Sequence, residues 1–267
     1  KRSVLAEQIN NEIYKLMPEY NYLYLGDNAR APYGNHSVDL VYQYTEQAVD
    51  FLFGQGCEII ILACNTASTG ALRKVQQQYL TAKYPDRRVL GVIRPVVEKA
   101  VGLTLNGRVG VIGTRLTIES NAFVTELRTQ VELQKKPAVQ IFQQACPLLV
   151  PLIEEGWDKK PETFKILEAY LKPLKSRKID TLILGCTHYP FLLSAIRRIM
   201  GPNVKIIHQG KIVAASFKDY FKRHPEIETK VGRGGEIKFL TTDNPERFDH
   251  LASRFFGRQI QSYKVSL

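Results

Sequence analysis

Short apolar runs rich in Val, Ile and Leu alternate along the chain with longer segments in which apolar residues recur every three or four positions. The short runs are typical of strands buried on both faces, and the longer spacing is typical of helices that cover them. We therefore expect an α/β protein with mostly parallel sheets flanked by helices. The predicted strands are 22–26, 58–63, 88–93, 108–113, 138–142, 181–185, 204–207 and 236–242.

Capping residues locate two of the helices. Ser37 can cap a helix that runs to about Gly54, and Thr117 can cap the helix that follows the strand over 108–113. The expected apolar face of the first of these helices consists of Val41, Tyr44, Ala48 and Phe51.

The chain opens directly on a helical segment, residues 3–18. A parallel α/β domain usually begins with a strand whose carboxyl end helps to build the site. We therefore expect that an N-terminal strand is missing from the sequence observed.

Length and composition are those of an ordinary globular protein. The chain has 267 residues, of which 44% are hydrophobic and 24% charged, and this length suits two modest domains. No apolar run approaches the roughly 20 residues of a membrane span, and the opening "KRSVLAEQINNEIY" is no signal peptide. The four cysteines lack the regular spacing of a disulfide scaffold. We expect a cytoplasmic protein without a membrane partner.

The net charge of +11 raises the question of nucleic-acid binding. Basic residues are dispersed in pairs such as Arg87–Arg88 and Lys135–Lys136, without a long basic run or interleaved aromatic residues. The pattern favours a solvated surface that weakly attracts anions over a nucleic-acid interface.

Two segments, "LACNTAS" (62–68) and "LGCTHYP" (184–190), repeat the order of apolar strand, cysteine and small polar residues. Ligand sites in open α/β sheets lie beyond the carboxyl ends of the strands, where Cys64 and Cys186 are expected. A helix start after each cysteine would favour a thiolate and could bind a substrate carboxylate. A lone cysteine after a strand is usually a small buried apolar residue, and we interpret Cys57 and Cys146 in that way.

Other polar residues extend this candidate site. The loop over 25–37, "LGDNARAPYGNHS", follows a predicted strand and either lines the site or simply forms a turn and a helix cap. His188 can tune or protonate the thiol of Cys186. A metal site that combines both cysteines with His188 and His208 lacks the usual ligand spacing, so we expect no metal.

Several segments together resemble the glutamate racemases of the cofactor-independent aspartate/glutamate racemase superfamily: "YLGDNARAPYGN", "ACNTAS", "GVIRP", "GVIGT", "ACPLLVPLIEEG", "LGCTHYP" and "FLTTDNPERF". The similarity covers nearly the whole chain. It implies two similar α/β domains, 1–94 with 208–267 and 95–207, and an active site at their interface.

The resemblance also implies the chemistry. The family interconverts L- and D-glutamate without metal or other cofactor and supplies D-glutamate for peptidoglycan, often as a homodimer. Cys64 would remove the α-proton of the D isomer and Cys186 that of the L isomer, with Glu154 supporting His188. The implied substrate contacts are Pro32, Tyr33, Gly34, Asn65, Thr66, Thr187 and His188. The family's opening strand and "DSG" loop do not occur in this sequence, and we expect that they are either truncated or not observed.

Three alternatives stay open. The substrate could be aspartate or another amino acid, and a panel of amino acids would decide. An inactive binding protein could use the basic surface, although two matched cysteines would then have no purpose. A Cys–His hydrolase would need only one cysteine.

Overall fold

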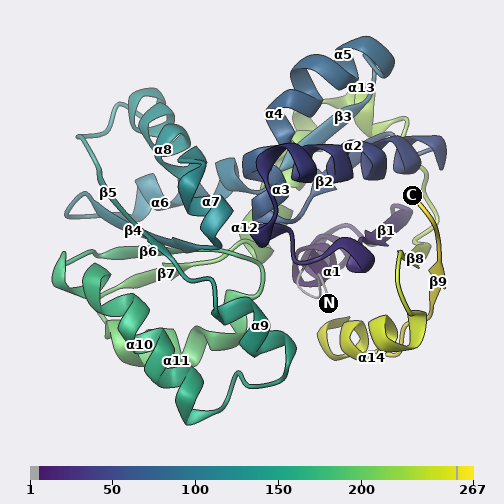
Figure 1. Ribbon diagram of the computed structural model, residues 1–267. Coiled ribbons are helices and arrows are strands. Elements are labelled where there is room, and N and C mark those ends of the chain that lie inside the picture. Colours follow the sequence, from purple (N-terminus) through teal and green to yellow (C-terminus); the bar gives the residue numbers. More distant parts are fainter. Residues whose placement is uncertain (1–5, 257) are drawn as a thin grey trace. The chain divides into compact units, whose positions relative to one another are not determined.

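The chain forms two compact units, which we call unit 1 (Lys1–Val92 with Gly210–Leu267) and unit 2 (Ile93–Gln209). The structure is a computed structural model that describes residues 6–256 and 258–267 (Figure 1). Unit 1 is assembled from both ends of the chain and unit 2 from its middle. Each boundary lies two residues from the one expected from the sequence.

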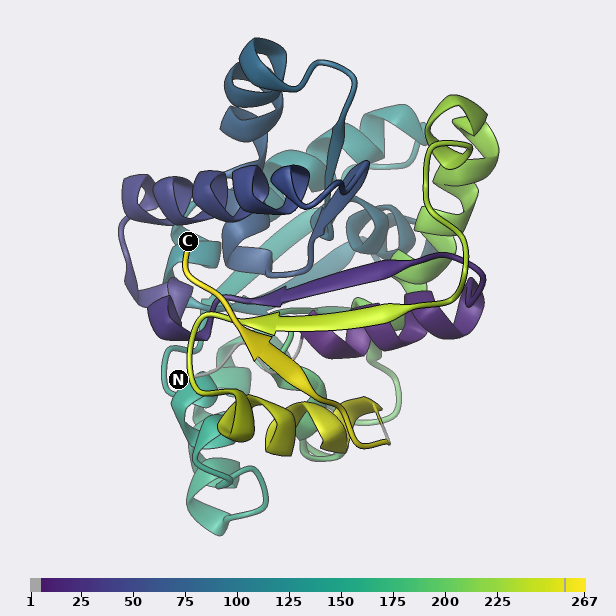
Figure 2. The same ribbon diagram turned by 90° about the vertical axis from the view of Figure 1, so that its right-hand side faces the viewer.

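Unit 1 contains two parallel sheets. Strand β1 (Tyr22–Gly26) pairs with β8 (Ile237–Thr241), and β8 pairs with β9 (Ser262–Lys264), as Figure 2 shows. Strand β2 (Ile59–Leu62) pairs with β3 (Arg88–Gly91). The carboxyl ends of these parallel strands carry the loops around Asp27 and Cys64.

Helices surround these sheets, and α1 packs against α12 and α14. The helices of unit 1 are α1 (Ala6–Leu16), α2 (Val38–Gly54), α3 (Asn65–Gly70), α4 (Leu72–Lys74), α5 (Leu80–Lys83), α12 (Gly210–Arg223), α13 (Pro225–Glu228) and α14 (Pro245–Phe256). Two 3-10 turns, η1 (Asn28–Arg30) and η2 (Tyr33–Asn35), and a π-helical turn, η3 (Val75–Tyr79), complete it.

Helix α2 confirms the predicted cap but corrects the predicted face. The Ser37 hydroxyl accepts a hydrogen bond from the Leu40 N–H at 3.3 Å. The expected face of Val41, Tyr44, Ala48 and Phe51 was wrong beyond its first residue. Tyr44 instead faces the loop before the helix, where the Arg30 guanidinium lies 4.4 Å from its ring centroid. The buried residues of α2 are Val41, Thr45, Val49 and Phe53.

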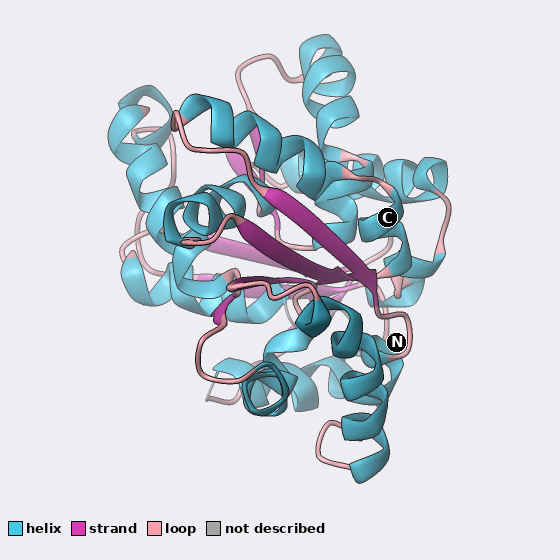
Figure 3. Ribbon diagram, turned by 90° about the vertical axis from the view of Figure 1, so that its left-hand side faces the viewer, coloured by secondary structure: helices cyan, strands magenta, loops and turns pink. Residues whose placement is uncertain are grey.

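Unit 2 is a single parallel sheet covered by helices (Figure 3). Its strand order is β5 (Gln140–Ala145), β4 (Arg108–Gly113), β6 (Thr181–Gly185) and β7 (Lys205–Ile207). Every residue of β6 is buried, as expected for a central strand that is covered on both faces.

Helices α6 and α8 lie on one side of this sheet and α10 and α11 on the other (Figure 1). The core between the sheet and α10 and α11 includes Leu167, Leu171, Leu182 and Ile196. The helices of unit 2 are α6 (Ile93–Leu103), α7 (Arg115–Glu119), α8 (Ala122–Leu133), α9 (Leu149–Glu154), α10 (Pro161–Ser176) and α11 (Leu193–Met200), with a 3-10 turn, η4 (Tyr189–Leu192).

Three further expectations need correction. Strand β5 lies about two residues later than predicted, because its pairing with β4 extends into the polar residues Gln143 and Gln144. The cap of α7 is Thr114, whose hydroxyl accepts from the Thr117 N–H at 3.3 Å, and Thr117 is buried inside the helix. Strand β9 was not predicted, because two of its three residues are exposed and it has no apolar run.

None of the helices in the part of the chain that the structure describes combines the length and the hydropathy that crossing a membrane requires.

Candidate active site

Cys64 lies two residues beyond the end of β2 and forms the N-cap of α3. The four residues that follow it, 65–68, are buried within unit 1. Hydrogen bonds of Ser68 hold the turn in place. The Ser68 hydroxyl donates to the Leu62 carbonyl oxygen at 2.8 Å and accepts from the Val92 N–H at 3.4 Å. This side chain therefore joins the carboxyl ends of β2 and β3 beneath the cysteine.

The thiol of Cys64 is surrounded by hydrogen-bond donors. The N–H groups of Thr66 and Ala67 and the Thr66 hydroxyl lie close enough to favour its charged form. Burial raises the pKa of the Cys64 thiol above its ordinary value of 9.0, and the three donors oppose that rise. The site therefore disfavours a resting thiolate but holds the groups that would stabilise one.

The polar loop after β1 is organised around Asp27. Its carboxylate accepts hydrogen bonds from Arg30 Nε at 2.7 Å, from the Thr242 hydroxyl at 2.9 Å and from the Tyr33 hydroxyl. Burial, followed by the adjacent Asp27 carboxylate, raises the pKa of Tyr33 far above its usual range. The loop is thus a hydrogen-bonded structure of its own and more than a turn with a helix cap.

Unit 1 brings this loop to the cysteine. The turn η2 packs against α3, and Cys64 is one of the groups whose charge acts on Tyr33. Gly34 is buried in the same turn, and Pro32 is its N-cap. Of the expected substrate contacts, unit 1 therefore gathers Pro32, Tyr33, Gly34, Asn65 and Thr66 near Cys64.

Cys186 directly follows β6 and is only 6% exposed. The expected helix start after this cysteine was wrong: the chain first forms a turn and η4, and α11 begins at Leu193. Gly185 explains the tight approach of β6 to β4, because a Cβ at this position would lie 2.7 Å from the Ile112 carbonyl oxygen.

A histidine and a carboxylate support Cys186 in place of the helix. The sulfur of Cys186 lies 3.8 Å from His188 Nδ1, and His188 Nε2 lies 3.2 Å from Glu154 Oε1. The His188 and Glu154 side chains are 8% and 6% exposed. A buried carboxylate beside the ring favours a proton on Nε2, which leaves Nδ1 facing the thiol. The chain Glu154–His188–Cys186 can therefore pass or share a proton.

The remaining cysteines have structural positions. Cys146 is fully buried, its pKa is raised by burial, and its carbonyl oxygen accepts from the Tyr189 hydroxyl at 3.1 Å. Cys57 is half-buried beside the core of unit 1, and burial raises its pKa to about 11. All four cysteines are free thiols. In the described ranges, no cluster of three or more His, Cys, Asp or Glu residues is placed to hold a metal ion.

Sequence reasoning did not single out Asp27 and Tyr189. Asp27 stands directly after a strand, which is a usable signal, since carboxyl ends of strands build sites in such folds. Tyr189 gave no signal, because its role depends on a carbonyl 43 residues away.

Comparisons with known proteins agree with these observations. Residues 4–216 match the family described as Asp/Glu/Hydantoin racemase. The chain is 38% identical to the glutamate racemase of Persephonella marina and 36% identical to that of Geobacter metallireducens; each match covers 96% of this chain and 91% of the relative.

Solved structures give the same result. A crystal structure of a glutamate racemase isoform from Bacillus anthracis aligns with a TM-score of 0.87 at 32% identity, over 98% of this chain and 94% of that one. The glutamate racemase of Francisella tularensis in complex with D-glutamate aligns with a TM-score of 0.86 at 28% identity, over 99% and 94%. The predicted α/β fold of two domains with parallel sheets flanked by helices is confirmed.

Proposed function

Because the chain belongs to the Asp/Glu/hydantoin racemase family, we propose that it interconverts L- and D-glutamate by proton transfer to and from two cysteines. The relatives at 34–38% identity are glutamate racemases, and the Francisella tularensis structure is a complex with D-glutamate. The observation that carries the proposal is the pair of cysteines at strand ends, each with its own polar support.

Racemisation requires that the α-proton leaves one face of the carbon and that a proton arrives on the other. In the D-to-L direction the Cys64 thiolate removes the α-proton, the C–H electron pair remains on the substrate, and the Cys186 thiol donates its proton to the opposite face. The L-to-D direction exchanges the two roles. Each acid–base contribution is worth about 10²–10⁴-fold.

The surrounding groups supply the rest of the rate acceleration. The N–H groups and the hydroxyl around Cys64 stabilise its thiolate, and His188 with Glu154 does so for Cys186. Asn65, Thr66 and Thr187, with the turn from Pro32 to Gly34, contact the substrate and fix its carboxylates. No cofactor takes part in this scheme.

The biological setting follows from the same family. We propose that the D-glutamate formed supplies peptidoglycan synthesis and that the reaction takes place in the cytoplasm, consistent with four free thiols. The resemblance also predicts a homodimer, which sedimentation would test.

The deciding experiment is incubation with L-glutamate in D₂O without added cofactor, followed by NMR of the α-proton and chiral separation of the product. The protein should exchange the α-proton and accumulate D-glutamate. Exchange with aspartate or another amino acid alone would keep the chemistry and change the substrate. No exchange with any amino acid, together with salt-dependent binding of an anionic partner, would favour a binding protein.

A further inference from the structure

Strand β5 is an edge of the sheet in unit 2, and one side of it pairs with no strand in the described part of the chain. The Gln140 N–H donates to the Gly107 carbonyl oxygen at 2.7 Å, so the even-numbered residues of β5 direct their backbone groups towards β4. Backbone groups alternate in direction along a parallel ladder. The residues whose N–H and C=O groups face the unpaired side are Ile141, Gln143 and Ala145, and the Ala145 carbonyl oxygen already accepts from Gln144 Nε2 at 2.8 Å.

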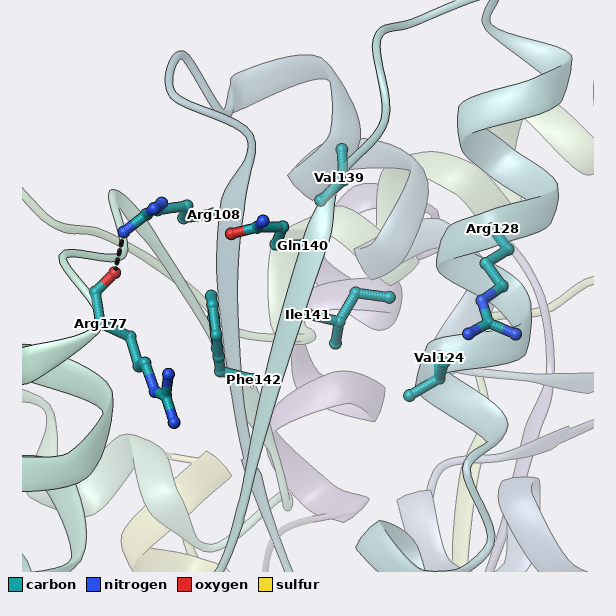
Figure 4. Close-up of a pocket in the computed structure, with 8 residues that line it drawn as sticks. All are labelled: Arg108, Val124, Arg128, Val139, Gln140, Ile141, Phe142 and Arg177. Atoms are coloured by element: carbon teal, nitrogen blue, oxygen red, sulfur yellow. Dashed lines mark hydrogen bonds between the residues drawn. The ribbon is translucent and has the colours of Figure 1, made fainter.

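A groove of about 590 Å³ lies at the first half of this edge, over residues 139–142, and three arginines line it. Figure 4 shows Arg108 and Arg177 on one side of β5 and Arg128 on the other. Arg108 Nη1 donates to the Arg177 carbonyl oxygen at 2.9 Å, and the Arg177 guanidinium lies 5.5 Å from the Phe142 ring centroid. The groove therefore has arginines on both sides of β5, and printed contacts hold those on one side, Arg108 and Arg177.

None of these three arginines forms an ion pair within residues 6–256 and 258–267. Two carboxylates of the same unit, Asp180 and Glu126, are engaged elsewhere. Asp180 accepts from the Thr104 hydroxyl at 2.7 Å and from two backbone N–H groups, and Glu126 lies 3.9 Å from Arg94. The lining of the groove thus carries a positive charge, with three arginines and no carboxylate, which favours an anionic partner.

Two features of the edge distinguish between possible occupants. A compact anion on one face would reach Arg108 and Arg177 or else Arg128, whereas an added strand directs alternate side chains to both faces. A second copy of this chain would bring the same arginines together, and each copy carries a net charge of +11. An acidic extended segment satisfies both the arginines and the unpaired backbone groups.

We propose that the β5 edge binds an acidic extended peptide, which adds to the sheet as a fifth strand. In this mode, main-chain hydrogen bonds give affinity and side chains give specificity. The inference concerns the β5 edge and does not depend on the proposed reaction.

Fluorescence anisotropy of the full chain with a labelled peptide of roughly ten alternating Glu and Val residues, long enough to span β5, tests the proposal. The peptide should bind, and binding should weaken as salt increases. Arg128→Gln and Arg177→Gln should each weaken binding about fivefold. Arg197→Gln, at an exposed arginine of α11, is the matched control and should leave binding unchanged.

Backbone pairing has its own test, because electrostatic attraction alone would tolerate changes in the peptide backbone. The same peptide with alternate N-methyl groups should bind at least about tenfold more weakly. Gln143→Pro, which removes an outward N–H from an edge strand, should have a similar effect. If Gln143→Pro failed to fold, the N-methylated peptide would still test the backbone pairing, because it is measured with the unaltered protein.

Three results would overturn the proposal. In the first, the methylated and unmethylated peptides bind equally, which would mean that the peptide backbone forms no hydrogen bonds with β5. In the second, inorganic triphosphate displaces the peptide completely, and the arginine variants bind neither the peptide nor triphosphate. Either result would indicate a site for compact anions. A dimer in sedimentation that Gln143→Pro dissociates would identify a second copy as the occupant.

Discussion

The two cysteine turns occupy equivalent positions at strand ends, yet they support their thiols by different means. Near Cys64, two N–H groups and the Thr66 hydroxyl favour the charged form of the thiol. Cys186 is supported by the His188 ring, which Glu154 holds at 3.2 Å. The repeated sequence pattern therefore located both thiols but did not show how they differ. Cys64 depends on the dipoles of N–H and hydroxyl groups, and Cys186 depends on the pair of His188 and Glu154.

Thermodynamics limits how this difference between the two cysteine turns can appear in the kinetics. L- and D-glutamate have equal free energies in water, so any variant must keep kcat/KM equal in the two directions. The asymmetry between the cysteine turns can appear only in kcat and KM taken separately, in isotope exchange and in pH profiles.

The largest effect is expected from removing either thiol. Cys64→Ala and Cys186→Ala should each lower racemisation by at least about 10³-fold, because each thiol serves one face of the α-carbon in the proposed reaction. In D₂O, Cys64→Ala should still exchange the α-proton of L-glutamate, and Cys186→Ala that of D-glutamate. NMR of each isomer measures this, and exchange of the same isomer by both variants would contradict the assignment of the two bases.

The carboxylate behind His188 should have the next largest effect. Glu154→Gln replaces a charged acceptor with a neutral one and should lower kcat about 10–100-fold, with a smaller change in KM. The neighbouring Glu155→Gln, at an exposed residue, is the control. A change confined to KM would mean that Glu154 acts on substrate binding and not through Cys186.

The two turns should differ in whether the residue before the cysteine tolerates a Cβ atom, and the difference should appear in the free energy of unfolding. Gly185→Ala would place a Cβ 2.7 Å from the Ile112 carbonyl oxygen and should destabilise the protein by about 1–3 kcal/mol. Ala63 holds the equivalent position in the first turn and shows that a Cβ is accommodated there. Urea unfolding measures the cost, and an unchanged midpoint for Gly185→Ala would show that β4 and β6 separate easily.

The smallest effect concerns the donors around Cys64. Thr66→Val removes a hydroxyl that lowers the pKa of the thiol, so that pKa should rise further above 9.0. Activity that depends on the thiolate should then begin to rise at higher pH, with a loss of about fivefold at neutral pH that diminishes in alkali. Thr66→Ser should restore the profile, and Thr69→Val should leave it unchanged.

Much of the fold could be predicted from apolar periodicity, because buried parallel strands are continuous apolar runs. The failures share a cause: β5 and β9 are edge strands with polar or exposed residues, so their limits depend on the partner strand. The face of α2 was misjudged because Tyr44 packs on a loop that periodicity does not describe.

The site was partly predictable for a similar reason. Residues adjacent in sequence to the cysteines, such as Thr66 and His188, could be proposed from position alone. The role of Asp27 could not, since it depends on Thr242, which reaches the loop only through the pairing of β1 with β8. Contacts between distant segments require the folded chain.

The hydroxyl of Tyr189, bound to the Cys146 carbonyl oxygen, ties the turn after Cys186 to the end of β5. A turn held in this way loses its conformational entropy once, when unit 2 folds, and the loss is not repeated in each catalytic cycle. The orientation of His188 is then a property of the folded unit. Any ordering that accompanies substrate binding must fall on other segments.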